Sequence, residues 1–402
     1  MRAAGTAIII VALSSAAHSA APQASPVMIV LTGQSMLRSD LRTTAPAAIP
    51  GIQSLLEGEV KFTNLEGTIA EAGQTAQEGR GFLAPPAALD ALQTLGFNLL
   101  ALADNHAFDL KGVGIANTLR EADRRRIVHA GTGDNLAAAT SPAYLHLSNL
   151  TVALVASASG LIAPGARAEA GQPGVNELRV MAGSQANEAD ADLPNGSDNT
   201  PNADDARRIL QSIREAKQHA DLVIVYQHNH VFGSRAFSTL FSEGMTERLA
   251  PNKWLTNWTH EEIRAGADIV IMHGAPLLHG IEIFRGRPIF YDLGNFIYNV
   301  PPTITYIDEP IAWESVVAKL TFHGKALQSI TLYPIVLNPI GEGQPDVHNP
   351  YANNQFLDTR GLPSRATGAK ARYILERLAS LSKPFGASVE LHGDVGVIRV
   401  SR

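Results

Sequence analysis

The sequence has 402 residues but no cysteine, and aromatic residues make up only 6% of it. Without cysteine the chain can form neither a disulfide framework nor a thiol nucleophile, and it cannot carry a lipid on a cysteine. Any metal site must therefore use histidine, asparagine and carboxylate side chains. Basic residues are outnumbered, giving a net charge of -6, and no basic stripe with interleaved aromatic residues points to nucleic acid as a partner.

Motifs of several common enzyme classes are also missing. No serine lies in a G-x-S-x-G elbow. The glycine pairs Gly112-Val113-Gly114 and Gly131-Thr132-Gly133 lack the strand–glycine–helix context of a dinucleotide loop, and neither is a P-loop. The sequence therefore favours neither serine hydrolysis nor nucleotide chemistry.

The N-terminal apolar stretch is shorter than the roughly 20 residues that a membrane-spanning helix needs. Arg2 supplies a positive start, Ala7–Leu13 an apolar centre, and Ser14–Ala21 a run of small residues. Ala17 and Ser19 occupy the −3 and −1 positions for cleavage after Ser19. We predict a signal peptide over residues 1–20 and export to the periplasm or the exterior, rather than an uncleaved anchor.

The rest of the chain, which is rich in hydrophobic residues, predicts a single mixed α/β domain. Residues 25–300 form its main part, and residues 301–402 form an extension of strands and a helix packed on the same domain. Gly183–Asp204 reads as a surface insertion that could serve as a lid. The expected strands are Val27–Thr32, Asn98–Ala103, Thr151–Ala156, Asp221–Tyr226, Asp268–Met272, the hairpin Ile281–Phe284 with Pro288–Tyr291, Ser315–Phe322, Ser329–Tyr333, Ser388–Leu391 and Val395–Val400. The expected helices are Pro86–Leu95, Gly112–Arg126, Ala203–His219, Thr259–Ala265 and Ala369–Leu381.

Four apolar runs stop at residues that could bind a metal or an anion. The runs and their polar ends are Val27–Leu31 before Thr32-Gly33-Gln34, Leu99–Ala103 before Asp104-Asn105-His106, Leu222–Val225 before Tyr226-Gln227-His228-Asn229-His230, and Ile269–Met272 before His273-Gly274. Short runs of this kind are typical of buried strands, and ligands of α/β sheets gather outside the carboxyl ends of the strands. We therefore expect a site assembled from distant parts of the chain.

Five residues at such positions carry suitable chemistry, namely Glu66, Asn105, His106, His228 and His273. Divalent transition metals favour imidazole nitrogen together with carboxylate or amide oxygen. Each residue alone could be an ordinary loop or turn residue. Their shared placement at the ends of separate strands favours a metal site. The run from Tyr291 to Phe296 predicts a specific tight turn. Packing of a strand end explains this turn at least as well as a role in catalysis.

At these residues the sequence resembles the CapA family of capsule-synthesis proteins, which is associated with poly-γ-glutamate production and related to calcineurin-like metallophosphoesterases. The resemblance runs from about residue 28 to about residue 300. Its motifs are Gly33-Gln34, Asn64-Leu65-Glu66, Asp104-Asn105-His106-Ala107-Phe108-Asp109, Gly174-Val175-Asn176-Glu177-Leu178-Arg179, His228, His273 and Pro288–Phe296. The resemblance implies a calcineurin-like α/β sandwich with two central mixed sheets flanked by helices.

The sequence departs from the family pattern at two positions. Gln34 stands where the family usually has aspartate, and Pro276 stands where a second histidine would fall. In the related phosphoesterases those positions serve one metal of a pair, so the resemblance implies one divalent ion (Mn, Fe or Zn) rather than two. Its ligands would be Glu66, Asn105, His228 and His273. His230 or His279 could replace a lost ligand, and Asn64, Asp104 and Asn295 are additional candidates.

The function implied by the resemblance is capsule or poly-γ-glutamate biosynthesis. The chain would be a metal-dependent hydrolase or amide-transfer enzyme acting on a cell-envelope polymer, with His106 as general acid or base. The substrate could be a γ-linked polyglutamate or a phosphoester. The loss of metal-binding residues at 34 and 276 supports the alternative of a non-catalytic assembly or export factor within a capsule-synthesis machinery. A metal-free periplasmic binding protein is a third reading.

Overall fold

The computed structural model describes Met1 and residues 26–76, 81–181, 199–232, 250–302, 310–349 and 354–400. The predicted signal peptide, apart from Met1, and residues 183–198 of the predicted insertion lie outside the described residues. Within the described part, no helix has both the length and the apolar character to cross a membrane.

The larger sheet of the described chain has nine strands and is mixed. Its order is β22 (Glu390–His392), β23 (Val395–Arg399), β20 (Ala326–Leu337), β19 (Glu314–His323), β1 (Val27–Leu31), β3 (Val60–Asn64), β6 (Leu99–Ala101) and β7 (Val128–Ala130), with β21 (Pro363–Arg365) paired to β20. β1, β3, β6 and β7 are parallel neighbours, whereas the strands of residues 314–399 join antiparallel. The C-terminal third thus adds antiparallel strands to the side of β1 that lies opposite β3.

The second sheet has a parallel centre and antiparallel edges. Its order is β16 (Ile281–Phe284), β17 (Arg287–Phe290), β15 (Ile269–His273), β14 (Leu222–Asn229), β10 (Thr151–Ser159) and β9 (Ala143–His146). β16 and β17 form the predicted hairpin. Arg285 and Gly286 have φ of 52° and 74° at its turn, which is the backbone of a type I′ connection.

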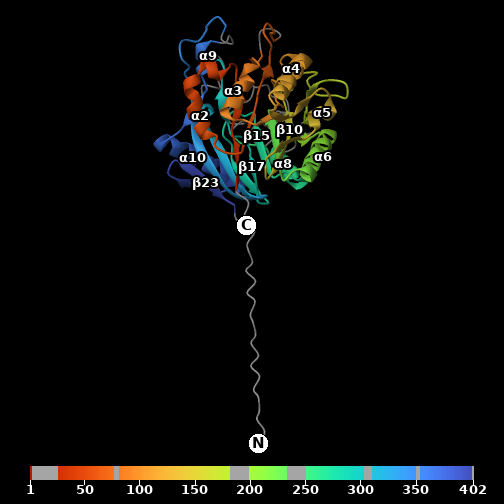
Figure 1. Ribbon diagram of the computed structural model, residues 1–402, viewed down its shortest axis with the longest axis vertical. Coiled ribbons are helices and arrows are strands. Elements are labelled where there is room, and N and C mark those ends of the chain that lie inside the picture. Colours follow the sequence, from red (N-terminus) through yellow and green to blue (C-terminus); the bar gives the residue numbers. More distant parts are fainter. Residues whose placement is uncertain are drawn as a thin grey trace, which may run out of the picture.

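Alternating side chains bury both faces of each sheet. Leu222, Ile224 and Tyr226 point into the core between the two sheets, whereas Val223 and Val225 point into the core under the helices. The helices are α1 (Leu41–Thr44), α2 (Ile49–Leu55) and α3 (Ala87–Leu95) over the larger sheet, α6 (Ala203–His219) and α8 (Lys253–Ala265) over the smaller one, and α4 (Lys111–Arg124), α5 (Leu136–Thr140), α9 (Gln355–Thr359) and α10 (Gly368–Ser382) around them. Figure 1 shows α6 and α8 on one side of the strands and α10 on the other. The predicted sandwich of two mixed sheets flanked by helices is confirmed.

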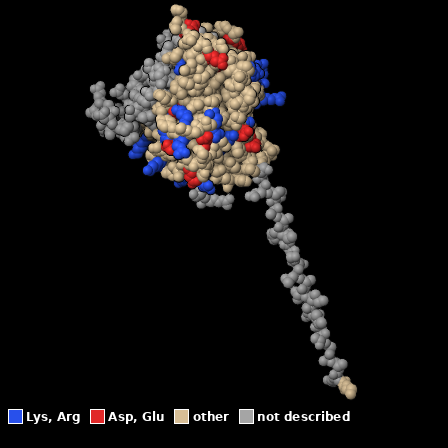
Figure 2. Space-filling model, turned by 90° about the vertical axis from the view of Figure 1, so that its left-hand side faces the viewer, with Lys and Arg blue, Asp and Glu red and all other residues tan. Residues whose placement is uncertain are grey.

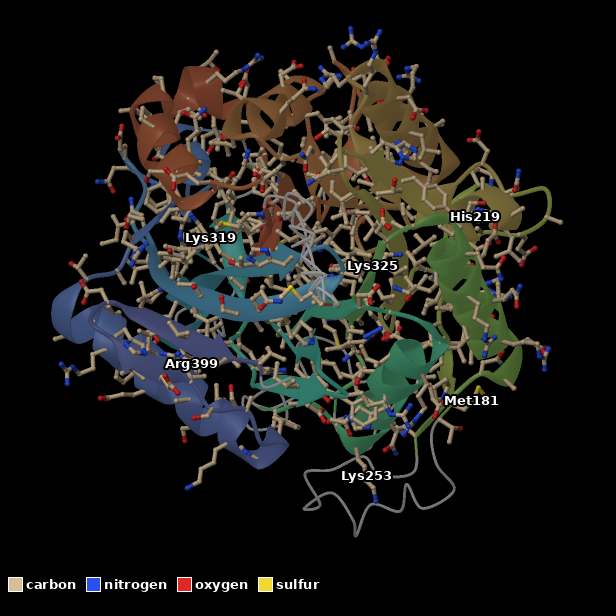
Figure 3. The ribbon with its side chains drawn as sticks, turned by 60° about the horizontal axis from the view of Figure 1, so that its bottom comes forward. Met181, His219, Lys253, Lys319, Lys325 and Arg399 are labelled. Atoms are coloured by element: carbon tan, nitrogen blue, oxygen red, sulfur yellow. The ribbon has the colours of Figure 1, made fainter. Side chains whose placement is uncertain are left out.

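Four short strand pairs lie outside the two main sheets. They are the pairs β2 (Gln34–Met36) with β18 (Asn295–Tyr298), β4 (Thr68–Ile69) with β5 (Leu83–Ala84), β8 (Thr132–Gly133) with β11 (Gly174–Val175), and β12 (Val180–Met181) with β13 (Thr200–Pro201). Figure 3 shows Met181 and His219 at opposite ends of α6, and Arg399 on β23 beside α10. On the face shown in Figure 2, side chains of both charges are interspersed.

The sequence predicted most elements but ended two strands too early. α6 matches its prediction, and α3 ends at Gly96, whose φ of 97° is a left-handed helix cap. His228 and His273 lie inside β14 and β15 instead of beyond them, so that prediction was wrong. The reason is pairing, because the ladder between β14 and β15 continues to His228 opposite His273.

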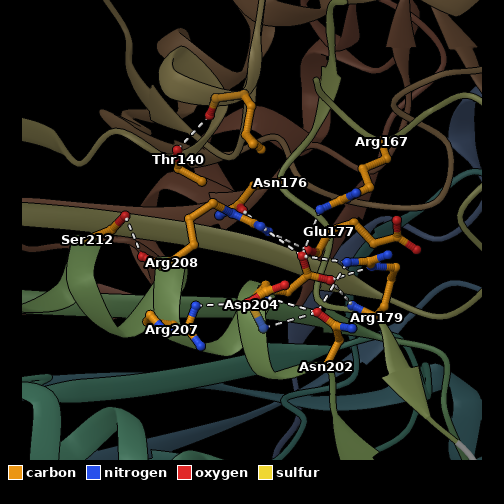
Figure 4. A network of polar contacts seen from close by, with 12 residues as sticks. Thr140, Arg167, Asn176, Glu177, Arg179, Asn202, Asp204, Arg207, Arg208 and Ser212 are labelled. Atoms are coloured by element: carbon orange, nitrogen blue, oxygen red, sulfur yellow. Dashed lines mark hydrogen bonds and ion pairs between the residues drawn. The ribbon is translucent and has the colours of Figure 1, made fainter. Parts of the chain in front are cut away.

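The loop of residues 174–179 is tied to the start of α6 by one buried carboxylate. Asp205 is fully buried and accepts hydrogen bonds from Arg167 Nη2 at 2.8 Å, Arg208 Nη1 at 2.8 Å and Arg179 Nε at 2.7 Å. Arg208 also donates to the carbonyl of Glu177 at 2.7 Å. Figure 4 shows the three arginines converging on this point. Although burial acts to raise the pKa of Asp205, the guanidinium groups outweigh it and hold that pKa below its ordinary value.

A second buried carboxylate, Glu262 on α8, has a different environment. Neither of its oxygens has a hydrogen-bond partner among the residues that the structure describes. Burial raises its pKa from 4.5 to about 8, with the nearby Trp258 indole acting in the opposite direction. The folded chain therefore keeps this proton up to about pH 8, whereas the unfolded chain loses it near pH 4.5.

This difference predicts that the free energy of unfolding falls as the pH rises from about 4.5 to about 8. Glu262→Gln keeps the shape and removes the titration. We expect this variant to match the native chain at pH 4 and to be more stable by on the order of 2–3 kcal/mol at pH 7 in urea denaturation. Glu261→Gln, at an exposed neighbouring position, is the control. A stability difference that is the same at both pH values would contradict the prediction.

Candidate metal site

The alternation of β14 places three polar residues on the side that faces the other sheet. Tyr226 and His228 are two residues apart in the strand, and His230 follows two residues later, just past the end of β14. His228 is fully buried, and His230 is 5% exposed. The rings of His228 and His230 are 4.8 Å apart between centroids. β14 therefore supplies two imidazoles to one point at the inner edge of its sheet.

Two residues from the larger sheet meet these imidazoles. His228 Nε2 lies 2.9 Å from Asn105 Oδ1 and 3.0 Å from His230 Nε2. Glu66 Oε1 is 3.7 Å from the same nitrogen. The ligand atoms of Glu66, His228 and His230 all lie within 4.8 Å of one another. Glu66 and Asn105 follow β3 and β6, so the cluster bridges the two sheets.

The cluster fits a divalent cation. Two donors bound to one ion at about 2.1 Å would be roughly 3–3.5 Å apart at right or tetrahedral angles, which is close to the observed separations. Glu66 Oε2 is buried and has no hydrogen-bond partner among the described residues. Burial raises the pKa of Glu66 to about 7 and lowers the pKa of His228 well below its ordinary value. Burial disfavours the carboxylate form of Glu66 and the imidazolium form of His228. A transition-metal dication would compensate the carboxylate charge and bind the neutral imidazole.

The hydroxyl of Tyr226 orients the imidazole of His228. It lies 3.0 Å from His228 Nδ1. When Nδ1 carries the proton and donates it to Tyr226, the lone pair of Nε2 points toward Asn105 and His230. Tyr226 was not among the site residues predicted from the sequence, although its spacing of two residues from His228 places both side chains on one face of the strand.

His273 occupies a different environment from the one predicted. In the described chain, the Glu66–His228–His230 group does not include it. Its Nδ1 lies 2.7 Å from Asn64 Oδ1, and its Nε2 lies 3.1 Å from the carbonyl oxygen of Thr32. Burial lowers the pKa of His273 to about 3, so the ring is neutral.

A neutral His273 cannot donate from both nitrogens to these two oxygens. This conflict disappears when the positions of Oδ1 and Nδ2 in the Asn64 amide are exchanged, because Nδ2 then donates to His273 Nδ1. The Nε2–H of His273 meanwhile donates to Thr32, and Asn64 Nδ2 otherwise has no partner among the described residues. Both ring nitrogens of His273 therefore contact protein groups in this structure, and His230 is the residue that lies in the group of ligand atoms with Glu66 and His228.

His106 lies next to Asn105 but outside the cluster of ligand atoms. Its Nδ1 is 2.8 Å from Asp109 Oδ2, and its side chain is 28% exposed. Burial acts to lower the pKa of His106, but the hydrogen bond and charge of Asp109 outweigh it and the pKa is raised. The contact with Asp109 orients the ring through Nδ1, so Nε2 is the nitrogen that Asp109 does not contact. Asp109 was in the predicted motif, and its i,i+3 spacing from His106 was the signal that it orients the ring.

Asp104 organises the turn that presents these residues. Its Oδ1 accepts the backbone N–H of His106 at 2.8 Å, and its side chain is 1% exposed. Burial and the nearby Glu66 charge raise its pKa well above the ordinary value. Asp104 is thus a positioning residue for Asn105 and His106.

One of the two departures from the family pattern, Gln34, forms a pair of buried amides with Asn295. Gln34 and Asn295 are paired in register between β2 and β18, and each is at most 2% exposed. Among the described residues, Gln34 Oε1 and Asn295 Oδ1 have no hydrogen-bond partner. The Nδ2 of Asn295 donates to the carbonyl of Pro276 at 3.3 Å. His279 is buried, and its backbone N–H donates to Asp292.

The turn from Tyr291 to Phe296 has a structural role. Asp292 accepts from the backbone N–H of Ala275 at 2.9 Å and of Gly294 at 2.7 Å. A Cβ on Gly33 would lie 2.3 Å from the Gly294 oxygen, so only glycine permits this approach. The turn therefore fixes the strand β18 against β2.

The neutral amide at position 34 gives a prediction for metal stoichiometry. Amide oxygen is a weaker partner for a dication than carboxylate, so we expect about one equivalent of metal per native chain. Gln34→Asp should raise the metal content above that of the native chain in elemental analysis after purification without chelator. Gln53→Glu, which changes an exposed glutamine in α2, is the control. A native chain that holds two equivalents would contradict the prediction.

The sequence profile described as "Bacterial capsule synthesis protein PGA_cap" matches residues 28–300, which is more than half of the chain. The chain belongs to this capsule-synthesis family. The match covers every residue of the cluster and of the His106–Asp109 pair, and it confirms the family predicted from the sequence.

Several known proteins are similar to the chain over different shares of its length. An uncharacterized protein of Sinorhizobium fredii, y4sH, is 29% identical over 89% of this chain and 90% of its own length. The PGA biosynthesis protein CapA of Bacillus subtilis is 27% identical over 52% of this chain and 44% of its own length. A solved structure described as a novel phosphatase of Mycoplasma pneumoniae aligns with a TM-score of 0.44 and 9% identity over 78% of this chain and 94% of its own.

Proposed function

We propose that this capsule-synthesis family member is a metal-dependent hydrolase that acts on a cell-envelope polymer, through a γ-glutamyl amide or a phosphoester linkage. The observation that carries the proposal is the cluster of buried Glu66, His228 and His230 with half-buried Asn105, beside the His106–Asp109 dyad. A metal site of this kind beside a partly exposed proton-transfer group is typical of hydrolases.

The residues divide the work in this proposal. Glu66, Asn105, His228 and His230 would hold the ion, which would supply Lewis acidity to the substrate oxygen. A water oxygen would form the new bond to the reacting carbon or phosphorus atom as the bond to the leaving group breaks, and the proton of that water would pass to solvent. His106 would give a proton from Nε2 to the leaving group, while Asp109 keeps the Nδ1 proton in place.

We also propose that the chain is exported and works with a capsule-synthesis machinery. The N-terminal charge, apolar centre and small residues support export. The family and the name of the Bacillus subtilis relative support the association with capsule synthesis.

A second function is favoured by the amide at position 34 and the proline at position 276. If one half of a usual metal pair is lost, the fold could serve as a binding module in capsule assembly. The mutual approach of Glu66, His228 and His230 supports the enzyme more strongly, because a binding module has no need for this cluster.

Incubation of manganese-loaded protein with γ-linked polyglutamate and with bis(p-nitrophenyl) phosphate tests the function. We expect metal-dependent release of shorter chains or of nitrophenol, which stops when the metal is removed by chelation. Chelated protein that has been reloaded with metal is the control for damage. If the loaded protein cleaves neither substrate nor cell-envelope peptides, the assembly-factor function replaces the hydrolase.

A further inference from the structure

The side of β14 that packs under the helices carries two buried amides at its end. Val223 and Val225 lie in the apolar core on this side of the strand. Gln227 and Asn229 continue the same side, and both are at most 3% exposed. Burying an amide costs free energy unless hydrogen bonds to protein replace those to water. The partners of these two side chains therefore indicate what they do.

Hydrogen bonds join the two amides to α8 and to β10. The indole Nε1 of Trp258 on α8 donates to Gln227 Oε1 at 2.8 Å, and Gln227 Nε2 donates to Ser159 Oγ at 2.9 Å. Ser159 is the last residue of β10, and its Oγ donates to Asn229 Oδ1 at 2.8 Å. These four side chains form an amide network in which each is at most 4% exposed. The Ser159 hydroxyl lies at its centre, because it accepts from one amide and donates to the other.

The amide network ends on the turn that carries His230. Asn229 Oδ1 also accepts the backbone N–H of Val231 at 3.2 Å, and Asn229 Nδ2 donates to the Val231 carbonyl at 3.3 Å. The backbone N–H of His230 donates to the Ser159 carbonyl at 2.7 Å. Ser159 and Asn229 thus hold the backbone of His230 and of the residue after it.

His230 depends on such support more than His228 does. The ladder between β14 and β15 ends at His228, and the ladder between β14 and β10 ends at Asn229. His230 therefore lies beyond both ladders, whereas His228 lies inside them. A metal ligand must be held within about 0.5 Å of its productive position. The amide network supplies at His230 the restraint that strand pairing supplies at His228.

We propose that Ser159 is a positioning residue of the metal site, whose hydroxyl holds the turn that aims His230 at Glu66 and His228. The inference rests on the metal site of the proposed function and adds to it a residue that touches neither the ion nor a ligand side chain. Without this hydroxyl, Gln227 loses an acceptor and Asn229 loses a donor in a buried place. Asn229 then holds the His230 turn less firmly, so His230 spends less time within reach of the ion.

Manganese binding by the full chain tests the proposal. Calorimetric titration gives the affinity, and electron spin-echo envelope modulation of bound manganese counts the histidine nitrogens on the ion. The native chain should show two such nitrogens, from His228 and His230. Ser159→Ala should bind manganese at least about tenfold more weakly, within the 10–100-fold range of groups that orient metal ligands. At saturating manganese it should show one histidine nitrogen.

Ser157→Ala is the matched control. Ser157 lies two residues earlier on the same face of β10 and is 1% exposed. Its hydroxyl has no hydrogen-bond partner among the residues that the structure describes. This variant should keep the native affinity and both nitrogens. Urea denaturation of the metal-free proteins shows whether each variant folds.

A second pair of variants tests the far end of the amide network if Ser159→Ala does not fold. Trp258→Phe removes the donor to Gln227 and should weaken manganese binding at least about threefold. Trp254→Phe makes the same change in the same helix, where the buried Nε1 has no hydrogen-bond partner in the described chain. It should keep the native affinity, and equal affinities of the two variants would overturn the proposal.

The outcomes separate this inference from the proposed function. Native affinity with two histidine nitrogens in Ser159→Ala would overturn the inference and leave the metal site intact. Weaker binding that keeps both nitrogens would also overturn it, because Ser159 would then act on a different ligand. A native chain that binds no manganese would overturn the metal site and the inference together.

Discussion

His106→Ala is expected to lower turnover by roughly 10²–10⁴-fold, the range typical of a positioned acid–base group. The reason is that Nε2 of His106 is the atom placed to move a proton, while Asp109 holds the other nitrogen at 2.8 Å. Hydrolysis of whichever substrate the loaded native chain cleaves is the measurement. Metal content should remain near the native value, because Asn105 and not His106 contacts His228.

His129→Ala is the matched control for this change. His129 pairs with Asp123 at 3.0 Å in a similar contact on β7 and belongs to no ligand cluster among the described residues. It should keep native turnover. Loss of metal together with activity in His106→Ala would make His106 a ligand, and unchanged turnover would leave it a structural role only.

Asp205→Asn is expected to destabilise the fold by about 3–5 kcal/mol, because it removes the one carboxylate that all three guanidinium groups share. Urea denaturation measures the change. Asp204→Asn is the control at the next position, where the side chain is 77% exposed and pairs with an exposed Arg207. That control should alter stability by at most about 0.5 kcal/mol. A loss in Asp205→Asn no larger than in the control would show that the network does not hold the loop of residues 174–179 in place.

The sequence predicted the layers because each strand and helix carried its own pattern. Buried strands such as β14 and β15 appear as short apolar runs, and α6 has both a capping residue and an apolar face. The placement of polar residues at the ends of these runs predicted which edge of the sheets would hold the candidate site.

The identity of the clustered residues could not be predicted in full. His230 joins Glu66 because β14 continues through His228, which depends on pairing with β10 and β15. His273 turns to the carbonyl of Thr32, a residue 241 positions away in the sequence. Such choices depend on register and side-chain rotamer, which no local pattern in the sequence encodes.

Tyr226 was missed for a related reason. Tyr226 reads as a core aromatic until its hydroxyl is seen 3.0 Å from His228. A residue that orients a ligand side chain is hard to predict from the sequence, because its role depends on a contact and not on its residue type.

The central claim is that Glu66, Asn105, His228 and His230 hold one divalent ion. Crystals of the full chain grown with manganese, with data collected on both sides of the manganese absorption edge, test it most directly. The account predicts an anomalous peak within about 2.0–2.4 Å of Glu66, His228 and His230, with Asn105 in the same shell. A peak bound by His273 in place of His230, or no peak at these residues in metal-soaked crystals, would contradict it.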